Sequence, residues 1–329
     1  MSSLNSGPRA EGPSQLDDLI ETFHGERQRL SSLAYRMLGS RADAQDIVQE
    51  AWIRLQRAAA GAEPIRDVPA WLTTTVSRLA LDQLRSARTR REVYVGPWLP
   101  EPIVGPHPTA RQAASDPGEV AALADELSFA MMVVLERLTP AQRAAFILHD
   151  TFGFSFTDVA SMLDRTPAAC RQLASRARDQ LSHQVRRIDA DADDHRRVLD
   201  AFLRACAGGD LAALVAVLDP SVVYRSDSGG AVRSALNVVA GADRVARLVL
   251  GVLHKFGTGH EFQTSTLNGE DGLLVYREGQ LVAAVAVTTV VAGDPARAAI
   301  TEINALVNPD KLAAVQSQLV AVQSQLGAT

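Results

Sequence analysis

Two helical segments that lie close together near the start of the chain constrain its fold most strongly. Residues 39–55 read GSRADAQDIVQEAWIRL, and residues 69–91 read PAWLTTTVSRLALDQLRSARTRR. In both, apolar residues recur at the spacing of an amphipathic helix, so each segment has one side to bury and one side to present. We expect residues 16–91 to form an all-helical domain, preceded by a disordered lead-in over residues 1–15.

The presented side of the first segment is acidic. Asp46, Gln49 and Glu50 follow one another at three and four positions, which places them on one outward face of a helix. Such a face suits contact with a protein partner. A solvated face on which Glu50 pairs with Arg54 explains the same pattern, so this segment by itself leaves both interpretations open.

The presented side of the second segment is basic. Hydroxyl and guanidinium groups share it, and such groups suit contacts with DNA phosphates and base edges. A basic helix that simply faces solvent would have the same pattern. The side chains assigned to this face and its continuation are Thr75, Arg78, Asp82, Arg85 and Arg88.

A third segment, residues 138–181, has the signals of a helix-turn-helix. Thr139 and Pro140 predict a capped helix start, and a helix over residues 156–163 is followed by a tight turn and a second capped helix. An inward stripe that includes Cys170 leaves a basic outward face suited to the major groove of DNA. A plain helical hairpin is the alternative. The outward face comprises Thr166, Arg171, Gln172, Ser175, Arg176 and Arg178.

The net charge of −5 is unevenly distributed along the chain. Residues 1–187 contain 22 Arg and 22 acidic residues, whereas residues 188–329 carry the whole excess of Asp and Glu. Basic stripes on a neutral body suit a protein that touches DNA at chosen places. The two cysteines fit a reducing cytoplasm, and no signal peptide or membrane-spanning run is recognised. We therefore expect a cytoplasmic protein without membrane contact.

The second half of the chain has a different character. Five prolines between positions 97 and 108 predict an extended linker over residues 92–120, after which residues 121–187 are again helical. The acidic run 189–194 predicts a hinge. Helices followed by strands indicate an α+β domain over residues 195–312, and the tail, 313–329, has an apolar stripe that we expect to dock on the same chain or fray. The expected elements are helices at 198–207 and 211–218 and strands at 222–225, 272–277, 281–291 and 298–307.

The three helical segments, in this order, resemble the extracytoplasmic-function (ECF, group 4) sigma factors of bacterial RNA polymerase. The resemblance covers residues 16–187 and implies two sigma domains, regions 2 and 4. It implies that the acidic face contacts the clamp helices of the β′ subunit and that the linker follows the RNA-exit path. It also implies that residues 72–91 approach the promoter −10 element, with loop 58–68 near a flipped base, and that residues 166–178 read the −35 element.

More narrowly, the chain resembles the ECF subgroup that has a C-terminal SnoaL-like extension of the NTF2-like fold. The linker text YVGPWLPEP and the later text NPDKL match motifs of that subgroup. A DGGGK-like turn survives at residues 227–231, but Ala231 replaces its lysine. The resemblance implies a regulatory interface of Trp98, Asp227, Gly229, Gly230, Asn308, Pro309, Asp310, Lys311 and Leu312.

The resemblance thus implies a multidomain fold: two all-α sigma domains, the second a helix-turn-helix, plus a C-terminal α+β NTF2-like cone. It implies a sigma factor that binds core RNA polymerase, through the β′ clamp and β, and promoter DNA, without a cofactor or metal of its own. The C-terminal domain is expected to contact the sigma domains of the same chain, so that no separate anti-sigma factor is required.

We expect no catalysis in the C-terminal domain. Its candidates, Tyr224, Asp227, His254 and His260, are scattered and have no spacing that pairs an acid with a base. Two other classes stay open from the residues alone. One is a regulator that binds DNA without polymerase, and the other is a DNA-binding module fused to a SnoaL-like enzyme or small-molecule sensor.

Overall fold

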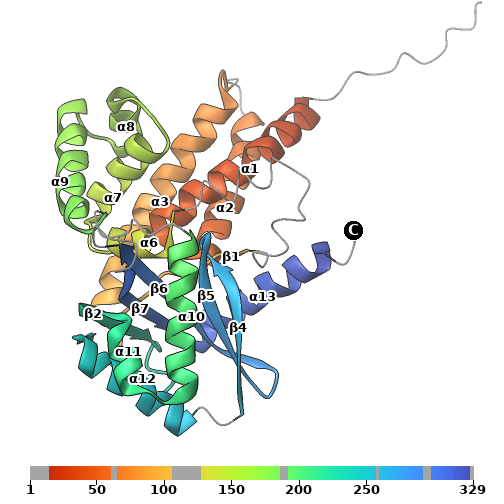
Figure 1. Ribbon diagram of the computed structural model, residues 1–329. Coiled ribbons are helices and arrows are strands. Elements are labelled where there is room, and N and C mark those ends of the chain that lie inside the picture. Colours follow the sequence, from red (N-terminus) through yellow and green to blue (C-terminus); the bar gives the residue numbers. More distant parts are fainter. Residues whose placement is uncertain are drawn as a thin grey trace, which may run out of the picture.

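The computed structural model describes residues 15–60, 65–105, 127–185, 192–256, 259–291 and 298–326. Helices make up the upper half of the molecule in Figure 1, and a sheet with further helices makes up the lower half. No helix in the described parts of the chain is long and apolar enough to cross a membrane. Residues 1–14 of the expected disordered lead-in, residues 106–120 of the linker and residues 189–191 of the acidic run lie outside the described residues, and Gln15 begins the first helix.

A sharp turn connects the first two helices of the N-terminal bundle. Gly39 has a φ of +71°, which glycine adopts without strain, and Ser40 caps the next helix by accepting a hydrogen bond from the Asp43 amide. The apolar stripes predicted from the sequence are buried here, with Leu55 and Leu72 fully inaccessible to solvent. The bundle consists of helices α1 (Gln15–Leu38), α2 (Arg41–Ala59) and α3 (Val68–Glu92).

The second helical unit contains the predicted helix-turn-helix. Thr139 and Gln142 form a reciprocal capping box, and Asp164 adopts a left-handed conformation (φ +53°) in the tight turn. Cys170 and Ala174 are fully buried, so Cys170 is a core residue as expected. The unit consists of α6 (Phe129–Leu135), α7 (Pro140–Phe146), the π-helical turn η1 (Ile147–Thr151), α8 (Phe156–Leu163) and α9 (Pro167–Val185).

The predicted α+β domain is confirmed, with two corrections. The predicted hinge is wrong for residues 192–194, because they begin a helix. Acidic side chains are favourable at a helix N-terminus, which explains why this run is helical. The sequence assigned no element to residues 242–267, which contain a helix and a strand. The helices are α10 (Ala192–Gly208), α11 (Leu211–Ala216) and α12 (Ala242–Phe256). The strands are β2 (Leu218–Asp227), β3 (Val239–Ala240), β4 (His260–Leu267), β5 (Glu270–Arg277), β6 (Gln280–Val291) and β7 (Ala298–Leu306).

The sheet has seven strands in the order β1-β4-β5-β6-β7-β2-β3. All neighbouring strands are antiparallel except β2 and β7, which are parallel. Strand β1 (Val104–Gly105) belongs to the linker and pairs with the end of β4, with Val104 opposite Leu267. The linker is therefore part of the sheet, whereas its prolines predicted only an extended segment.

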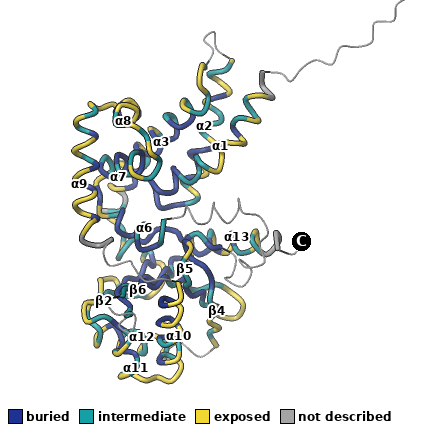
Figure 2. The backbone as a smooth tube through the Cα atoms, turned by 45° about the horizontal axis from the view of Figure 1, so that its top comes forward, coloured by how far each residue is buried: buried dark blue, intermediate teal, exposed yellow. Residues whose placement is uncertain are grey.

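The two faces of the sheet have different neighbours. Val222 and Ile303 belong to the core under α10, α11 and α12. Leu274 and Leu306 belong to a second core that includes Leu99 of the linker, Phe129 of α6 and residues of the last helix, α13 (Pro309–Leu326). In Figure 2 the buried residues continue from the helical half through α6 into the sheet. The first part of the tail docks on its own chain, since Val315 is fully buried.

Candidate functional site

The acidic face of α2 is partly open. Asp46 and Gln49 are exposed, whereas Glu50 is half-buried and accepts a hydrogen bond from Arg54 at 2.8 Å. The Glu50–Arg54 pair expected of a solvated helix face is thus present. It leaves Asp46 and Gln49 available to a partner.

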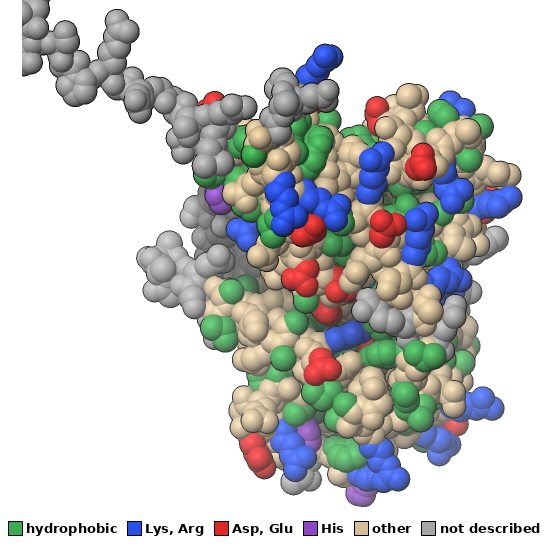
Figure 3. Space-filling view, turned by 180° about the vertical axis from the view of Figure 1, so that it is seen from behind, with side chains coloured by type: hydrophobic (Ala, Val, Ile, Leu, Met, Phe, Trp, Pro, Cys, Tyr) green, Lys and Arg blue, Asp and Glu red, His purple; other side chains and the backbone are tan. Residues whose placement is uncertain are grey.

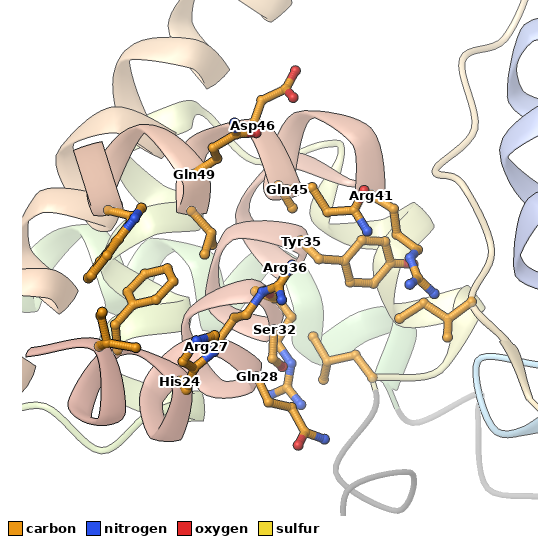
Figure 4. Close-up of a pocket in the computed structure, with 18 residues that line it drawn as sticks. His24, Arg27, Gln28, Ser32, Tyr35, Arg36, Arg41, Gln45, Asp46 and Gln49 are labelled. Carbon is orange, nitrogen blue, oxygen red and sulfur yellow. The ribbon is translucent and has the colours of Figure 1, made fainter. Parts of the chain in front are cut away.

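A groove of about 1100 Å³ runs between α1 and α2 beside this face (Figure 4). Asp46 and Gln49 line it from α2, and polar side chains of α1 lie across from them. The rings of Phe23 and Trp52, whose centroids are 4.7 Å apart, form part of its apolar lining. Ile103 of the linker also lines it, so the groove extends from the acidic face to the linker.

The basic face of α3 is exposed over most of its length. Asp82, Arg85 and Arg88 face solvent and Thr75 is half-buried. Asp82 accepts a hydrogen bond from Arg85 at 3.1 Å, which neutralises part of the local charge. These side chains lie on one side of the helix, as the spacing predicts.

Arg78 is the member of this face that contacts the helix-turn-helix unit. Its guanidinium donates to the carbonyl of Ser161 at 2.9 Å and to that of Met162 at 3.3 Å. Both carbonyls belong to the last turn of α8, where backbone carbonyls lack partners within the helix. The same N–H groups cannot bind a DNA phosphate while this contact is made.

The outward face of α9 is largely open. Thr166 accepts a hydrogen bond from the Ala169 amide at 3.2 Å and so starts the helix. Arg178 binds both carboxylate oxygens of Asp150, at 2.6 and 3.2 Å, which fixes α9 to η1. Lys and Arg side chains are distributed over the helical half of the face seen in Figure 3. All six members of the predicted −35 face are exposed: Thr166, Arg171, Gln172, Ser175, Arg176 and Arg178.

The predicted regulatory residues meet around Asp227, which is fully buried at the end of β2. Its carboxylate accepts hydrogen bonds from the Tyr94 hydroxyl at 2.6 Å, the Leu99 amide at 2.8 Å and Lys311 Nζ at 2.7 Å. The Gly229 amide donates to it at 3.2 Å. We call this contact between linker residues 91–101, Asp227 and the start of α13 the linker joint.

Two cations lie over the ring of Trp98 in the linker joint. The Arg91 guanidinium carbon is 3.4 Å and Lys311 Nζ is 3.9 Å from the ring centroid. Lys311 also donates to the Leu99 carbonyl. Burial lowers the pKa of the Lys311 ammonium, and the adjacent Asp227 carboxylate opposes this effect. Lys311 therefore supplies a cation at the turn that lost its expected lysine, while Ala231 is exposed.

The two glycines of the turn permit this close packing. A Cβ atom on Gly229 would lie 2.6 Å from Asn308 Nδ2, and one on Gly230 would lie 3.2 Å from the Val95 Cβ. Both residues have positive φ angles, +58° and +79°. Asn308 donates to the Tyr94 hydroxyl at 2.8 Å, so the turn, the linker and the chain before α13 interlock.

Not every predicted residue takes part in the joint. Pro309 and Asp310 are exposed at the start of α13, and Leu312 is buried in the core beneath the linker. Tyr94 and Arg91 are central to the joint but were not predicted individually. Tyr94 could have been included because it belongs to the same linker motif as Trp98.

Further linker contacts tie the helical half to the sheet. The Glu101 carboxylate accepts from the Arg41 amide at 2.7 Å, and its carbonyl accepts from the Tyr35 hydroxyl at 2.8 Å. Asn268, after β4, donates to the same Tyr35 hydroxyl at 3.1 Å. Gln318 of α13 accepts from both Val104 and Arg41. The Asn268–Tyr35 and Gln318–Arg41 bonds cross directly between the two halves of the molecule, and the other bonds join each half to the linker.

The end of α3 is bound to the second helical unit through one carboxylate. Glu136 pairs with both Arg91 and Arg143, and Arg143 is almost completely buried. Arg143 also donates to the Arg36 carbonyl at 3.0 Å. Because Arg91 lies over Trp98 as well, both helical units and the linker share one network of charges.

The catalytic candidates are not brought together. Asp227 lies in the linker joint, and His254 is exposed on α12. His260 begins β4 and Tyr224 lies on β2, strands separated in the sheet by β5, β6 and β7. Burial raises the pKa of the Tyr224 hydroxyl. Among the described residues, no group of histidine, cysteine and carboxylate side chains could hold a metal ion.

The fold and these surfaces define a class: a DNA-binding chain with two helical units, one of them a helix-turn-helix, joined to an α+β domain. Residues 22–90 match the model of Sigma-70 region 2, and residues 128–181 match that of Sigma-70, region 4. The order and position of these matches agree with the three helical segments of the sequence.

Relatives extend the match over nearly the whole chain. The ECF RNA polymerase sigma factor SigJ of Mycobacterium tuberculosis is 43% identical over 299 residues, which is 89% of this chain and 92% of SigJ. The probable sigma factor SigI of the same organism is 35% identical over 307 residues, or 93% of this chain and 99% of SigI. The crystal structure of SigJ matches with a TM-score of 0.68 and 38% identity, covering 89% of this chain and 98% of that one.

The chain belongs to the ECF sigma factors of RNA polymerase. It binds core RNA polymerase and directs transcription initiation at specific promoters. Its C-terminal part is an α+β domain built on a mixed sheet. Both the predicted family and the predicted fold class are confirmed.

Proposed function

We propose that this sigma factor contains its own restraint. The C-terminal domain holds the linker and both sigma domains together through the linker joint, and no separate anti-sigma factor is needed. The observation that carries this proposal is the buried Asp227 carboxylate, which binds Leu99 of the linker and Lys311 of α13 at the same time. Burying a charge is costly unless it is paired, so the joint specifies one position of the linker.

The partner surfaces follow from the exposed faces. Asp46, Gln49 and Glu50, with the adjoining groove, contact the β′ clamp of core polymerase, and region 4 contacts the β subunit. The exposed side of α3 approaches the −10 element, and the exposed side of α9 reads the −35 element. The protein acts in the cytoplasm, where core polymerase is found.

The restraint acts on the linker and on the two DNA-facing surfaces. A linker that forms strand β1 and binds Asp227 cannot at the same time follow a path through polymerase. Arg78 is occupied by α8, which ties the −10 face to the helix-turn-helix unit. Promoter engagement therefore requires the joint and the Arg78 contact to open.

The test is run-off transcription with purified core polymerase on a promoter library, comparing full-length wild type with Asp227→Ala/Lys311→Ala. Removing both partners avoids leaving one buried charge alone, so the variant loses the link with less damage to folding. We expect more transcripts at limiting sigma factor and the same promoter sequences. The exposed pair Asp243→Ala/Arg247→Ala in α12 is the matched control. Equal initiation and equal core affinity for variant and wild type would contradict the restraint.

A truncation after residue 187 is a second form of this test. It removes the whole C-terminal domain, but it also exposes Leu99 and Phe129, which are buried against the sheet. The double variant keeps this core covered and is therefore the cleaner comparison.

A further inference from the structure

An aromatic side chain of α8 lies under one of the exposed arginines of α9. The guanidinium carbon of Arg171 is 5.6 Å from the centroid of the Phe156 ring, within the range of a cation–π interaction. Phe156 is the first residue of α8, and Arg171 lies in the second turn of α9. The two helices of the helix-turn-helix thus meet at this contact.

Phe156 is itself held in place from η1. The His149 ring stacks on it, with centroids 3.8 Å apart and an interplanar angle of 26°. His149 Nδ1 is 2.8 Å from the Phe154 carbonyl. Because a carbonyl can only accept, Nδ1 carries the proton and donates it there. The π-helical turn therefore fixes the histidine, the histidine fixes the phenyl ring, and the ring supports the arginine.

Arg171 lies near the N-terminus of α9, where its orientation affects how the helix contacts promoter bases. Residues in the N-terminal turns of a recognition helix contact base edges, and an arginine fork fits O6 and N7 of guanine best. A free arginine loses much rotamer freedom when it binds, whereas one already held over a ring loses less. The neighbouring Arg178 is instead bound to Asp150, so the exposed cations of α9 are not equivalent.

Building on the sigma function proposed above, we propose that Phe156 is a positioning residue that holds Arg171 for a guanine in the −35 element. Phe156 does not touch DNA itself. It acts through Arg171, and its contribution is to sequence-specific binding and not to general attraction for DNA phosphates.

The experiment measures binding of full-length holoenzyme to a promoter fragment recovered by run-off transcription from a library randomised in its −35 region. Phe156→Leu keeps an apolar side chain of similar size but removes the ring. We expect a two- to fivefold loss of affinity for the selected promoter, as a cation–π contact at an exposed site predicts, and no loss for DNA with a scrambled −35 region. Phe156→Tyr retains the ring and should bind as wild type does.

A double-mutant cycle separates positioning from folding. The effect of Phe156→Leu should disappear when Arg171 is already alanine and persist when the exposed Arg176 is alanine. Replacing guanines of the −35 element by 7-deazaguanine removes the N7 acceptor, and one such replacement should likewise cost nothing in the Arg171→Ala background.

Different results would contradict the positioning role of Phe156 and the proposed function. An equal loss from Phe156→Leu in the Arg171→Ala background, an equal loss on scrambled DNA, or failure of Phe156→Tyr to retain binding would overturn the positioning role alone. A wild-type protein that formed no initiation complex with core polymerase on any library member would instead overturn the assigned DNA-reading surfaces of the proposed function.

Discussion

Asn308, immediately before α13, donates a hydrogen bond of 2.8 Å to the hydroxyl of Tyr94 in the linker. The same hydroxyl donates a hydrogen bond of 2.6 Å to the Asp227 carboxylate. Burial and the adjacent carboxylate raise the pKa of the Tyr94 hydroxyl, so it remains a donor throughout the physiological range. One hydroxyl thus connects three segments that are far apart in the sequence.

Replacing Tyr94 by phenylalanine should weaken this connection. The Asn308 amide and one oxygen of Asp227 would each lose a partner in a buried site, which costs about 1–3 kcal/mol. We expect a lower midpoint of thermal unfolding and an earlier change in tryptophan fluorescence, because Trp98 lies in the same joint. Tyr276→Phe, in strand β5 outside the joint, is the control. An unchanged midpoint for Tyr94→Phe would show that the hydroxyl is dispensable.

Gly229→Ala should disrupt the linker joint, because the added methyl group clashes with the Asn308 side chain. The added Cβ would approach Asn308 Nδ2 to 2.6 Å, and the left-handed φ of +58° adds about 1 kcal/mol of backbone strain. Gly209 has a similar φ of +63° and nothing within 4 Å of a Cβ, so Gly209→Ala isolates the backbone cost. We expect Gly229→Ala to reduce the free energy of unfolding by clearly more than Gly209→Ala does. Equal losses would mean that the turn relaxes without disturbing Asn308.

Arg78→Ala should loosen the packing of α3 against α8. Two hydrogen bonds to helix-terminal carbonyls are lost, each worth about 1 kcal/mol, and the carbonyls become free to bind water. Fluorescence energy transfer between labels on Arg57 and Asp179, after substitution by cysteine in a background without Cys170 and Cys206, would report the spacing of the two units. We expect a wider distance distribution for Arg78→Ala. Arg85→Ala, on the same helix but bonded to Asp82 of that helix, should leave the distribution unchanged.

Glu270 gives a pH-dependent prediction. Burial raises the pKa of its carboxyl from 4.5 to about 7, so between these values the folded protein binds a proton that the unfolded chain does not. The resulting stabilisation is complete below pH 4.5 and is lost as the pH rises through about 7. Glu270→Gln stays neutral, so its stability relative to wild type should increase over this window by an amount on the order of 2–3 kcal/mol.

Urea denaturation of wild type and Glu270→Gln at about pH 5 and about pH 8 tests this difference. Glu261→Gln, exposed on the neighbouring strand, provides the control. A relative stability that is the same at both pH values would show that the Glu270 carboxyl is not desolvated.

The helical half could be predicted from the sequence because its signals are local. Ser40, Thr139 and Thr166 cap helices where the sequence places caps, and the apolar stripes are buried as their spacing indicates. Helix α12 has an amphipathic pattern of the same local kind, with Val245 and Ala246 buried. For Asp227 and Lys311, the motifs indicated a shared interface but not the direct ion pair between them.

The remaining contacts depend on distance in three dimensions, which no local pattern contains. Arg78 had the spacing of a DNA-facing residue, and nothing near it in the sequence indicates the carbonyls of α8 that it binds. Strand β1 is two residues long and pairs with a strand more than a hundred residues away. The spacing places Arg171 and Arg178 on the same predicted −35 face, but it does not indicate that Arg171 lies over Phe156 and that Arg178 pairs with Asp150.

The position of Lys311 has a consequence for the newly made chain. Proteins are synthesised from the N-terminus, and domains fold as units in that order. The helices of both sigma domains, which end at Val185, leave the ribosome well before Lys311 does. Until then Asp227 lacks its cation, and the nascent protein presents complete sigma domains without the contact that fastens the linker. Each newly made molecule therefore passes once through a state in which the linker joint has not yet closed.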